Sequence, residues 1–113
     1  MTFKAKNKWG NKPVTIDGIW FQSIKEGNRW CELKLLERAK TISNLERQVR
    51  FELTPKMVRS DGKIEDKSSY IADFVYIENG KRVVEDSKGA RLPDYMLKRK
   101  MMLFILGIEI LET

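Results

Sequence analysis

The sequence predicts one domain of the α/β (α+β) class: an α-β-β-β-α-β core, in which two helices flank a mixed sheet, preceded by a short N-terminal hairpin. Three observations predict this fold. The chain has 113 residues, which suits a single compact core. Asn79-Gly80 separates two apolar runs, a strong signal for a two-residue hairpin turn. Two longer stretches repeat apolar residues at helical spacing. We expect residues 1–12 to form a basic arm and residues 13–113 to form the domain.

The composition narrows the chemistry that the domain can perform. The chain has no histidine, which excludes a Ser-His-Asp triad and histidine-based metal sites. Acid–base chemistry would therefore fall to carboxylates, lysines and metal-bound water. Cys31 is the single cysteine, so an internal disulfide and a cysteine zinc site are excluded. No apolar run could span a bilayer and the N-terminus has no secretory signal, so we expect a cytoplasmic protein without a membrane partner.

The net charge of +6 favours a polyanionic partner. Four lysines lie in the first twelve positions, where there is no acid, and Lys98-Arg99-Lys100 forms a second basic cluster. Such clustering is typical of proteins that bind nucleic acid. A solvated basic face explains the charge as well, so charge alone does not decide between the two.

The first elements after the arm are a hairpin and a helix. Asp17-Gly18 between short apolar runs predicts a hairpin over Val14–Phe21 that packs on the core. Helical spacing predicts a helix from Ser23 to about Ile42 with one apolar stripe. That stripe consists of Ile24, Cys31, Leu35, Ala39 and Ile42. Gly27 also lies on the stripe and is a weak helix former, so it marks either a close approach to another element or a loosely wound first turn.

Glu26, in the first turn of this helix, admits two interpretations. Ser23-x-x-Glu26 is the pattern of a capping box, in which the Glu26 carboxylate accepts a hydrogen bond from the Ser23 N–H. Alternatively, the carboxylate faces the sheet and takes part in a site there. Helix chemistry alone favours the cap.

The middle of the chain predicts three strands. Asn44–Pro55 contains the first, with clean alternation over residues 48–53, and Pro55 ends it. Lys56–Ser68 is predicted to be a polar loop with a turn at Asp61-Gly62. Ser69–Gly89 supplies the other two strands as a hairpin. One face of that hairpin carries Ile71, Asp73, Val75, Val84, Asp86 and Lys88, and the other carries Ala72, Phe74, Tyr76, Val83 and Glu85.

The C-terminal part predicts a second helix and a last strand. Pro93 is suited to the start of the helix, with Asp94 in its first turn and Gly107 as its C-terminal cap. The predicted core stripe consists of Leu97, Met101 and Phe104, and the residues off it are Tyr95, Lys98 and Arg99. Ile108–Leu111 is predicted to be the last strand. The Met101–Phe104 cluster could belong to the core or to a dimer face.

The turn at Asn79-Gly80 sets a register in which Asp73 faces Asp86, with Lys88 two residues further along the same side. Two unit charges about 5 Å apart repel by roughly 3 kcal/mol at an effective dielectric of about 20. A divalent metal ion would offset this repulsion. Mg²⁺ takes oxygen ligands and keeps several waters, so Asp73 and Asp86 suffice, and Glu26 could add a third oxygen if the first helix packs on this face. Lys88 could then orient a metal-bound water for attack on a phosphorus.

The order of these residues resembles the PD-(D/E)xK nuclease superfamily, and more closely a family of small phage-encoded, endonuclease-like proteins within it. The resemblance covers about residues 9 to 112, nearly the whole chain. It is carried by Asp17-Gly18, Phe21, Ser23–Glu26, Glu32–Glu37, Ile42–Leu45, Gln48, Phe51–Leu53, Tyr70–Phe74, Val83–Gly89, Tyr95 and Lys98. Ala72 stands where the motif's name has a proline, which is common in this superfamily.

The resemblance implies a restriction-endonuclease-like fold and Mg²⁺-dependent hydrolysis of DNA phosphodiester bonds, with Mn²⁺ as a substitute. It implies Asp73 and Asp86 as metal ligands, Lys88 as the catalytic lysine, and Glu26 as the upstream acid and third ligand. Because Glu85 directly precedes Asp86, a register error of one residue would exchange their roles. The hairpin register favours Asp86, because it points Glu85 to the opposite face.

The resemblance also suggests partners. Many members of the superfamily, Holliday-junction-resolving enzymes among them, act as homodimers on branched DNA. Branched or junction DNA and a second copy of the chain are therefore candidate partners, in a bacterial host's cytoplasm if the chain is phage-encoded. The candidate DNA contacts are Lys4, Lys6, Lys8, Lys12, Gln48, Tyr95, Lys98 and Arg99. A non-catalytic DNA-binding protein and a phage accessory protein with the same fold remain alternatives.

Overall fold

The structure, a computed structural model, describes residues 12–87 and 92–113. Its elements are β1 (Val14–Ile16), β2 (Ile19–Phe21), α1 (Ile24–Arg38), β3 (Ile42–Thr54), β4 (Met57–Val58), β5 (Ile64–Glu65), β6 (Ser68–Glu78), β7 (Lys81–Asp86), α2 (Pro93–Met101), the π-helical segment η1 (Met102–Leu106) and β8 (Leu111–Glu112). The predictions for Lys4, Lys6, Lys8 and Lys88 fall outside the described residues.

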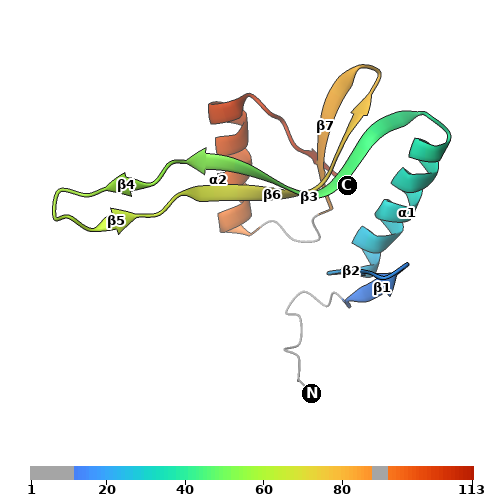
Figure 1. The fold of residues 1–113 in the computed structure, drawn as a ribbon, viewed down its shortest axis with the longest axis horizontal. Coiled ribbons are helices and arrows are strands. Elements are labelled where there is room, and N and C mark those ends of the chain that lie inside the picture. Colours follow the sequence, from blue (N-terminus) through green and yellow to red (C-terminus); the bar gives the residue numbers. More distant parts are fainter. Residues whose placement is uncertain (1–11, 88–91) are drawn as a thin grey trace.

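A four-stranded sheet in the order β3-β6-β7-β8 forms the centre of the molecule. The first three strands are antiparallel and β8 runs parallel to β7, so the sheet is mixed. Phe74 and Tyr76 pack with Leu33 of α1, whereas Val75, between them on β6, packs with Met102 after α2. The two helical segments therefore cover opposite faces (Figure 1), and the predicted single α+β domain with a mixed sheet is confirmed. None of the described helices has the length and apolar character needed to cross a membrane.

The hairpin β1–β2 forms as predicted and packs closely on α1. Asp17 and Gly18 both have positive φ (50° and 80°), as a tight two-residue turn requires. A Cβ added to Gly27 would lie only 2.8 Å from Ile16 Cδ1 and 3.1 Å from Val14 Cγ1. The close approach predicted for Gly27 is therefore confirmed, and it is to β1.

The predicted apolar stripe of α1 is wrong. Ile24 and Leu35 are exposed (52% and 60%), while Leu33 is fully buried and Trp30 stacks on Phe74 with ring centroids 6.1 Å apart. Apolar residues occur around more than one side of α1, so spacing alone does not select the buried side. The contact of β1 at Gly27 sets the helix rotation instead. The helix also ends at Arg38, before the predicted Ile42.

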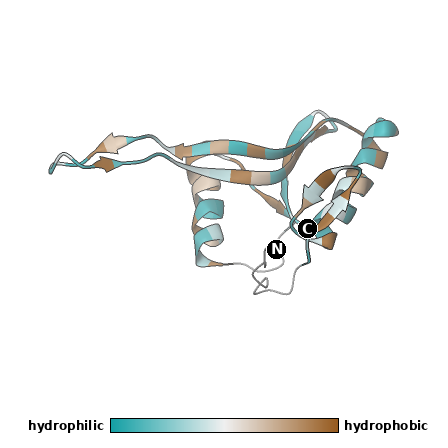
Figure 2. Ribbon diagram, turned by 60° about the horizontal axis from the view of Figure 1, so that its bottom comes forward, coloured by the Kyte–Doolittle hydropathy of each residue, from teal (hydrophilic) through white to brown (hydrophobic). Residues whose placement is uncertain are grey.

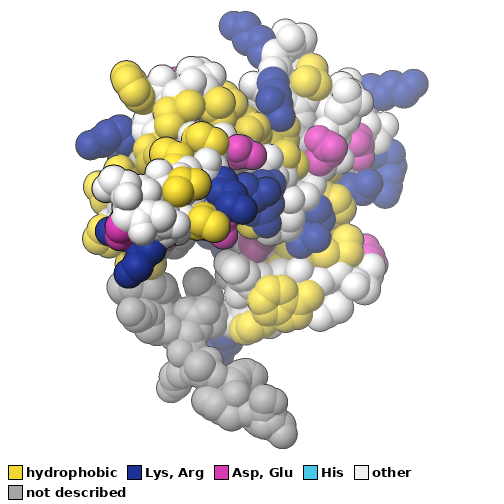
Figure 3. Space-filling view, turned by 60° about the vertical axis from the view of Figure 1, so that its left-hand side comes forward, with side chains coloured by type: hydrophobic (Ala, Val, Ile, Leu, Met, Phe, Trp, Pro, Cys, Tyr) yellow, Lys and Arg dark blue, Asp and Glu magenta, His cyan; other side chains and the backbone are white. Residues whose placement is uncertain are grey.

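The segment predicted to be a polar loop forms an arm. Its turn includes Gly62 (φ +86°), as predicted, but β4 and β5 pair across it, with Val58 opposite Ile64. These strands continue the β3–β6 ribbon away from the body of the molecule (Figures 1 and 2). Figure 3 brings the arm side forward and shows lysine and arginine side chains scattered among apolar ones rather than gathered in one patch.

The hairpin register predicted from Asn79-Gly80 is confirmed. Both turn residues have positive φ (53° and 75°), and Glu78 pairs with Lys81 and Phe74 with Glu85. The faces predicted near the turn are also correct. Further along β6 they are wrong: Ala72, predicted on the face of Phe74, belongs to the cluster beneath α2, and Ile71, predicted beside Val75, is 41% exposed.

Both strands of the β3–β6 ribbon change faces at one point. On β6, Tyr70 and Ala72 pack on the α2 side, but Phe74 and Tyr76 pack on the α1 side. On β3, Val49 and Phe51 pack on the α2 side, but Leu45 packs on the α1 side. Strict alternation would keep each set on one face. Gln48 has φ +55°, left-handed for a non-glycine residue, and it lies between the register pairs Arg47↔Phe74 and Val49↔Ala72. The ribbon thus turns over at Gln48 and Asp73.

The helix α2 starts at Pro93 and η1 ends at Gly107 (φ +69°), as predicted, but its predicted core stripe is wrong. Leu97 and Phe104 are 55% and 88% exposed, while Met102 is fully buried. Met102 lies seven residues after the buried Tyr95, so the two share one face of the helix, and it is this face rather than that of Leu97 that is buried.

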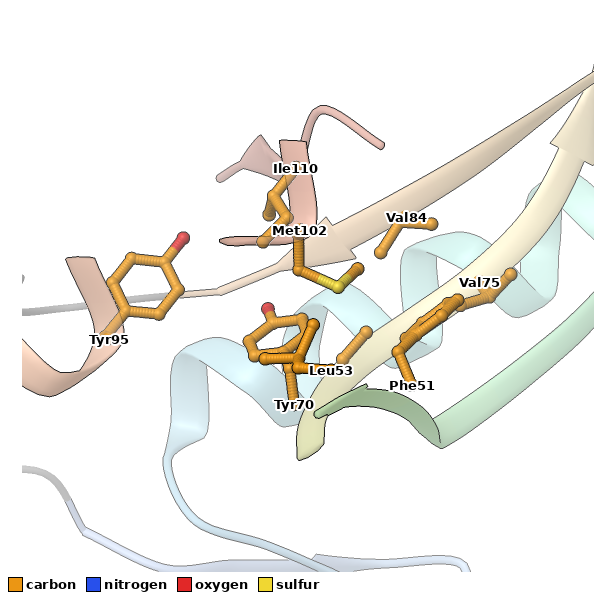
Figure 4. Packing of buried hydrophobic residues seen from close by; sticks show 9 residues of the cluster. Phe51, Leu53, Tyr70, Val75, Val84, Tyr95, Met102 and Ile110 are labelled. Carbon is orange, nitrogen blue, oxygen red and sulfur yellow. The ribbon is translucent and has the colours of Figure 1, made fainter. Parts of the chain in front are cut away.

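Tyr95, predicted off the stripe, is buried in the cluster beneath α2 (Figure 4). Its burial is tolerated because its hydroxyl donates to Glu112 at 2.5 Å. The last strand is Leu111–Glu112 rather than Ile108–Leu111, and Ile110 before it joins the same cluster.

Candidate active site at the strand turnover

Asp73 lies where the ribbon turns over, across from the end of β7. The last register pair of β6 and β7 is Phe74↔Glu85, and Asp73 and Asp86 are the next residues on these two strands. Asp73 Oδ2 accepts a hydrogen bond of 2.9 Å from the Ser87 backbone N–H. This bond holds the Asp73 carboxylate beside the last described residues before position 88.

Gln48 connects Asp73 to the first helix. Its Nε2 lies 3.4 Å from Asp73 Oδ1 and 3.3 Å from Glu26 Oε2. One amide group therefore donates to carboxylates from two elements, α1 and β6. The left-handed backbone of Gln48 is part of this arrangement, because the turnover of the ribbon occurs there.

Glu26 is 4% exposed, and its two oxygens have different partners. Oε1 accepts a hydrogen bond of 3.3 Å from the Gln22 N–H, while Oε2 faces Gln48. The Ser23 side chain accepts from the Glu26 N–H at 3.1 Å, so this half of the predicted capping box is present. The other half is wrong, since the carboxylate bonds to Gln22 and not to Ser23. The two interpretations of Glu26 are thus compatible: one oxygen serves the helix start and the other faces the site.

Asp86 is fully buried on the α2 side of the sheet. The Tyr70 hydroxyl donates a hydrogen bond to Asp86 Oδ2. Burial, together with this bond to a carboxylate, raises the pKa of Tyr70 well above its usual range, so the hydroxyl stays protonated and remains a donor.

Glu85 points to the α1 face of the sheet, as the register predicts, and both of its oxygens accept hydrogen bonds there. Arg29 donates to both of its oxygens, from Nε at 2.6 Å and Nη2 at 3.0 Å. The Tyr76 hydroxyl (2.6 Å) and the Thr113 hydroxyl (3.2 Å) donate as well. The bond to Glu85 raises the pKa of Arg29, and burial raises that of Tyr76. This fully bonded buried ion pair is structural.

The donor chemistry at the turnover fits Mg²⁺ in part. Glu26 and Asp73 offer carboxylate oxygens that converge on one amide nitrogen, and Mg²⁺ needs only one or two carboxylates. The Ser87 hydroxyl beside them is buried without a hydrogen-bond partner among the described residues. In residues 12–87 and 92–113, however, no group of three or more acidic, cysteine or histidine side chains could hold a metal ion. Asp86 therefore does not form a metal-binding group of three acids with Glu26 and Asp73.

The candidate DNA contacts are dispersed. Gln48 lies in the site, and Lys12 is exposed ahead of β1. The prediction for Tyr95 is wrong, because its ring lies in the core against Tyr70 and its hydroxyl is engaged by Glu112. Arg99 pairs with the same Glu112 at 2.9 Å. Lys98 is half-buried on α2, and no described contact connects it to the turnover.

A pocket beside the acids was missed by sequence reasoning. It has a volume of about 470 Å³ and is lined by Gly18, Ile19, Trp20, Gln22, Glu26, Arg47 and Gln48. Three elements and the β2–α1 connection contribute to it, so no local motif indicates it. The exposed Trp20 and the basic Arg47 line this pocket and do not belong to the acidic motif.

The fold and the site define a single-domain α+β protein with acidic side chains at a strand turnover of its mixed sheet. The chain belongs to the family described as "Protein of unknown function (DUF1064)", whose model matches residues 6–105. Comparisons with curated proteins and with solved structures each find no match.

Proposed function

We propose that this protein is a metal-dependent endonuclease of the restriction-endonuclease-like type that hydrolyses DNA phosphodiester bonds. The observation that carries the proposal is the convergence of Glu26 and Asp73 on the Gln48 amide. Carboxylates from different elements that converge in this way are suited to a divalent cation.

Glu26 and Asp73 would hold Mg²⁺ or Mn²⁺, with Asp86 as a further acid on β7. The metal would activate a water and offset charge on the phosphate. The protein's own groups position these acids: Gln22 N–H holds one oxygen of Glu26, and Ser87 N–H holds one oxygen of Asp73. Lys88 follows Ser87 directly in the sequence, which supports its role as the lysine that contacts the phosphate or the attacking water.

Each acid of the proposed site accepts a hydrogen bond from a side chain: Glu26 and Asp73 from Gln48, and Asp86 from Tyr70. Hydrogen bonds to the charged form compensate for removal from water. We expect a bound cation to replace some of these donors as the partner of the carboxylate oxygens.

A non-catalytic DNA-binding or phage accessory protein is the second candidate. The full burial of Asp86 and its bond to Tyr70 favour it, because a carboxylate used by a metal needs access to that metal. Both candidates share the DNA partner, which the net charge of +6 supports.

A cleavage panel separates the two candidates. Linear, nicked, flapped and four-way-junction DNA are incubated with the full chain in Mg²⁺, Mn²⁺ or EDTA. Cleavage that needs the metal and disappears in Asp73→Asn supports the endonuclease, and faster cleavage of branched forms supports a structure-selective one. Tight binding without cleavage in any metal supports the second candidate.

We also propose that two copies associate through α2 and η1. Leu97, Leu103 and Phe104 are more than half exposed there, beside a pocket of about 710 Å³ that Leu97 and Leu103 help to line. A face that carries both a bulky apolar side chain and an apolar pocket can bind a second copy of itself, because two-fold symmetry places the side chain of each copy against the pocket of the other. Lys100 and Glu109, on the same pocket, add opposite charges that suit this arrangement.

A further inference from the structure

The pocket that shares Glu26 and Gln48 with the acidic site also contains Trp20 and Arg47, two side chains that the acidic site does not use. We infer that this pocket binds an unstacked nucleobase of the DNA substrate, with the Trp20 indole as its stacking surface. The inference rests on the proposed DNA function, and it adds a subsite that selects DNA with an unpaired nucleotide.

Trp20 is held outward by the hairpin that carries it. It pairs with Thr15 across β1–β2, while its neighbour Phe21 is fully buried against Trp30. Alternation along β2 therefore turns the Trp20 ring away from the core, and Trp20 is 58% exposed. An indole on a short, packed hairpin loses little freedom when it binds a flat ligand.

Arg47 supplies a fixed positive charge next to the indole. Its guanidinium lies over the Phe21 ring at 4.9 Å, and Nη2 donates to the Trp20 carbonyl at 3.3 Å. These two contacts hold the guanidinium in place, and a fixed planar guanidinium suits a phosphate or a base edge.

The remaining lining residues suit a base and place it near the acids. The Gln22 amide can donate to and accept from the edge of a base, and the Gln48 amide, whose nitrogen donates to Glu26 and Asp73, can accept through its oxygen. Glu26 belongs both to the pocket and to the turnover site. A base bound in this pocket would therefore lie close to a phosphate bound at Glu26 and Asp73.

A base cannot stack on Trp20 while it is stacked and paired within a duplex. Aromatic side chains bind bases of single strands, loops and splayed ends, where the base faces are accessible. The pocket therefore favours flaps, junctions and single-stranded segments over continuous duplex.

The test measures binding in EDTA, where cleavage cannot occur. Kd values of the full chain are measured by fluorescence anisotropy for a single-stranded oligonucleotide, a flap and a blunt duplex. For Trp20→Ala we expect affinity for the first two to fall about 5- to 100-fold, the range of base stacking on an aromatic side chain. Duplex affinity should change by less than about twofold. Trp20→Phe should keep most of the affinity, and Leu35→Ala, an exposed position on α1 outside the pocket, should match the wild type.

Arg47→Gln is the second variant, and it should also weaken single-strand binding more than duplex binding. Equal loss for single strand and duplex in Trp20→Ala, or no loss in either, would overturn the inference. Trp20-dependent binding to RNA that is tighter than to DNA of the same sequence would overturn DNA as the ligand. Absence of metal-dependent cleavage with an intact Trp20 effect would remove the endonuclease proposal alone, so the two failures are distinguishable.

Discussion

The Asp73 carboxylate accepts a hydrogen bond of 2.9 Å from the backbone N–H of Ser87, one strand away and directly before Lys88. Asp73→Asn keeps the size of the side chain and removes its charge. We expect metal-dependent cleavage to fall by more than about 100-fold, since even the outer partners of metal ligands contribute about 10–100-fold. The melting temperature should stay or rise, because repulsion with Asp86 is lost. Cleavage assays and thermal melts check both, with Asp66→Asn, exposed near the arm, as the matched control.

Glu26→Gln distinguishes the two uses of the Glu26 carboxylate. The amide oxygen can still accept from the Gln22 N–H, so the helix start should lose only a few tenths of a kcal/mol in free energy of unfolding. The charge that would bind a cation is lost, so cleavage should fall sharply. Unimpaired cleavage in a stable variant would assign Glu26 to the helix start alone. Glu32→Gln, mostly exposed on the same helix, is the control.

Glu85 and Asp86 should respond in opposite ways. Arg29→Met leaves the buried Glu85 without its charged partner, with only the Tyr76 and Thr113 hydroxyls as donors, and we expect the free energy of unfolding in urea to fall by about 3–5 kcal/mol. Glu85→Gln should also destabilise, yet keep cleavage per folded molecule. Asp86→Asn should instead abolish cleavage. If Glu85→Gln alone abolished cleavage at full folding, the register assignment of the motif acid would have to be reversed.

The buried tyrosines predict a loss of stability in alkali. Burial is the main cause that raises the pKa of Tyr70, Tyr76 and Tyr95 above the ordinary 10, followed by hydrogen bonds to carboxylates. The unfolded chain releases these protons near pH 10 while the folded chain keeps them. Their contribution is therefore full below pH 10 and declines as the pH rises toward the folded values. Urea unfolding from pH 8 to 11 should show this decline, and Tyr70→Phe should make it shallower.

The exposed apolar face of α2 and η1 predicts that a charged substitution there converts a dimer into a monomer. Phe104 is 88% exposed beside an apolar pocket, so Phe104→Glu would place charge in the contact between two copies. We expect light scattering after size-exclusion chromatography to give a dimer for the wild type and a monomer for this variant. Ile64→Glu, an equally conspicuous apolar position on the arm, should remain dimeric. A wild type that is monomeric at high concentration would remove this proposal.

Local backbone chemistry made several features predictable from the sequence. Asn79-Gly80 and Asp17-Gly18 specify tight turns because few residues adopt positive φ, and the first of these set the register from Glu78↔Lys81 to Phe74↔Glu85. Pro93 and Gly107 marked helix ends because proline has a fixed φ and no N–H, while glycine readily adopts a positive φ. The close contact at Gly27 was predictable because a glycine weakens a helix unless something needs the space.

The buried sides of both helices were not predictable in this way. Apolar residues occur on several sides of α1, and β1 selects one of them at Gly27. In the C-terminal helical segment the face that carries Tyr95 and Met102 is buried, while Leu97 and Phe104 are exposed. Such choices depend on contacts between segments far apart in the chain, which residue spacing does not contain.

The sequence by itself determined the α+β class and the register of the β6–β7 hairpin, because turns and alternation are local properties of the backbone. Only the tertiary structure decided that Gln48, in a left-handed conformation, turns the ribbon over and bonds to both Glu26 and Asp73. It also decided that Trp20 and Arg47 share a pocket with Glu26. These groups come from separate elements, and packing of the first helix and the N-terminal hairpin against the sheet brings them together.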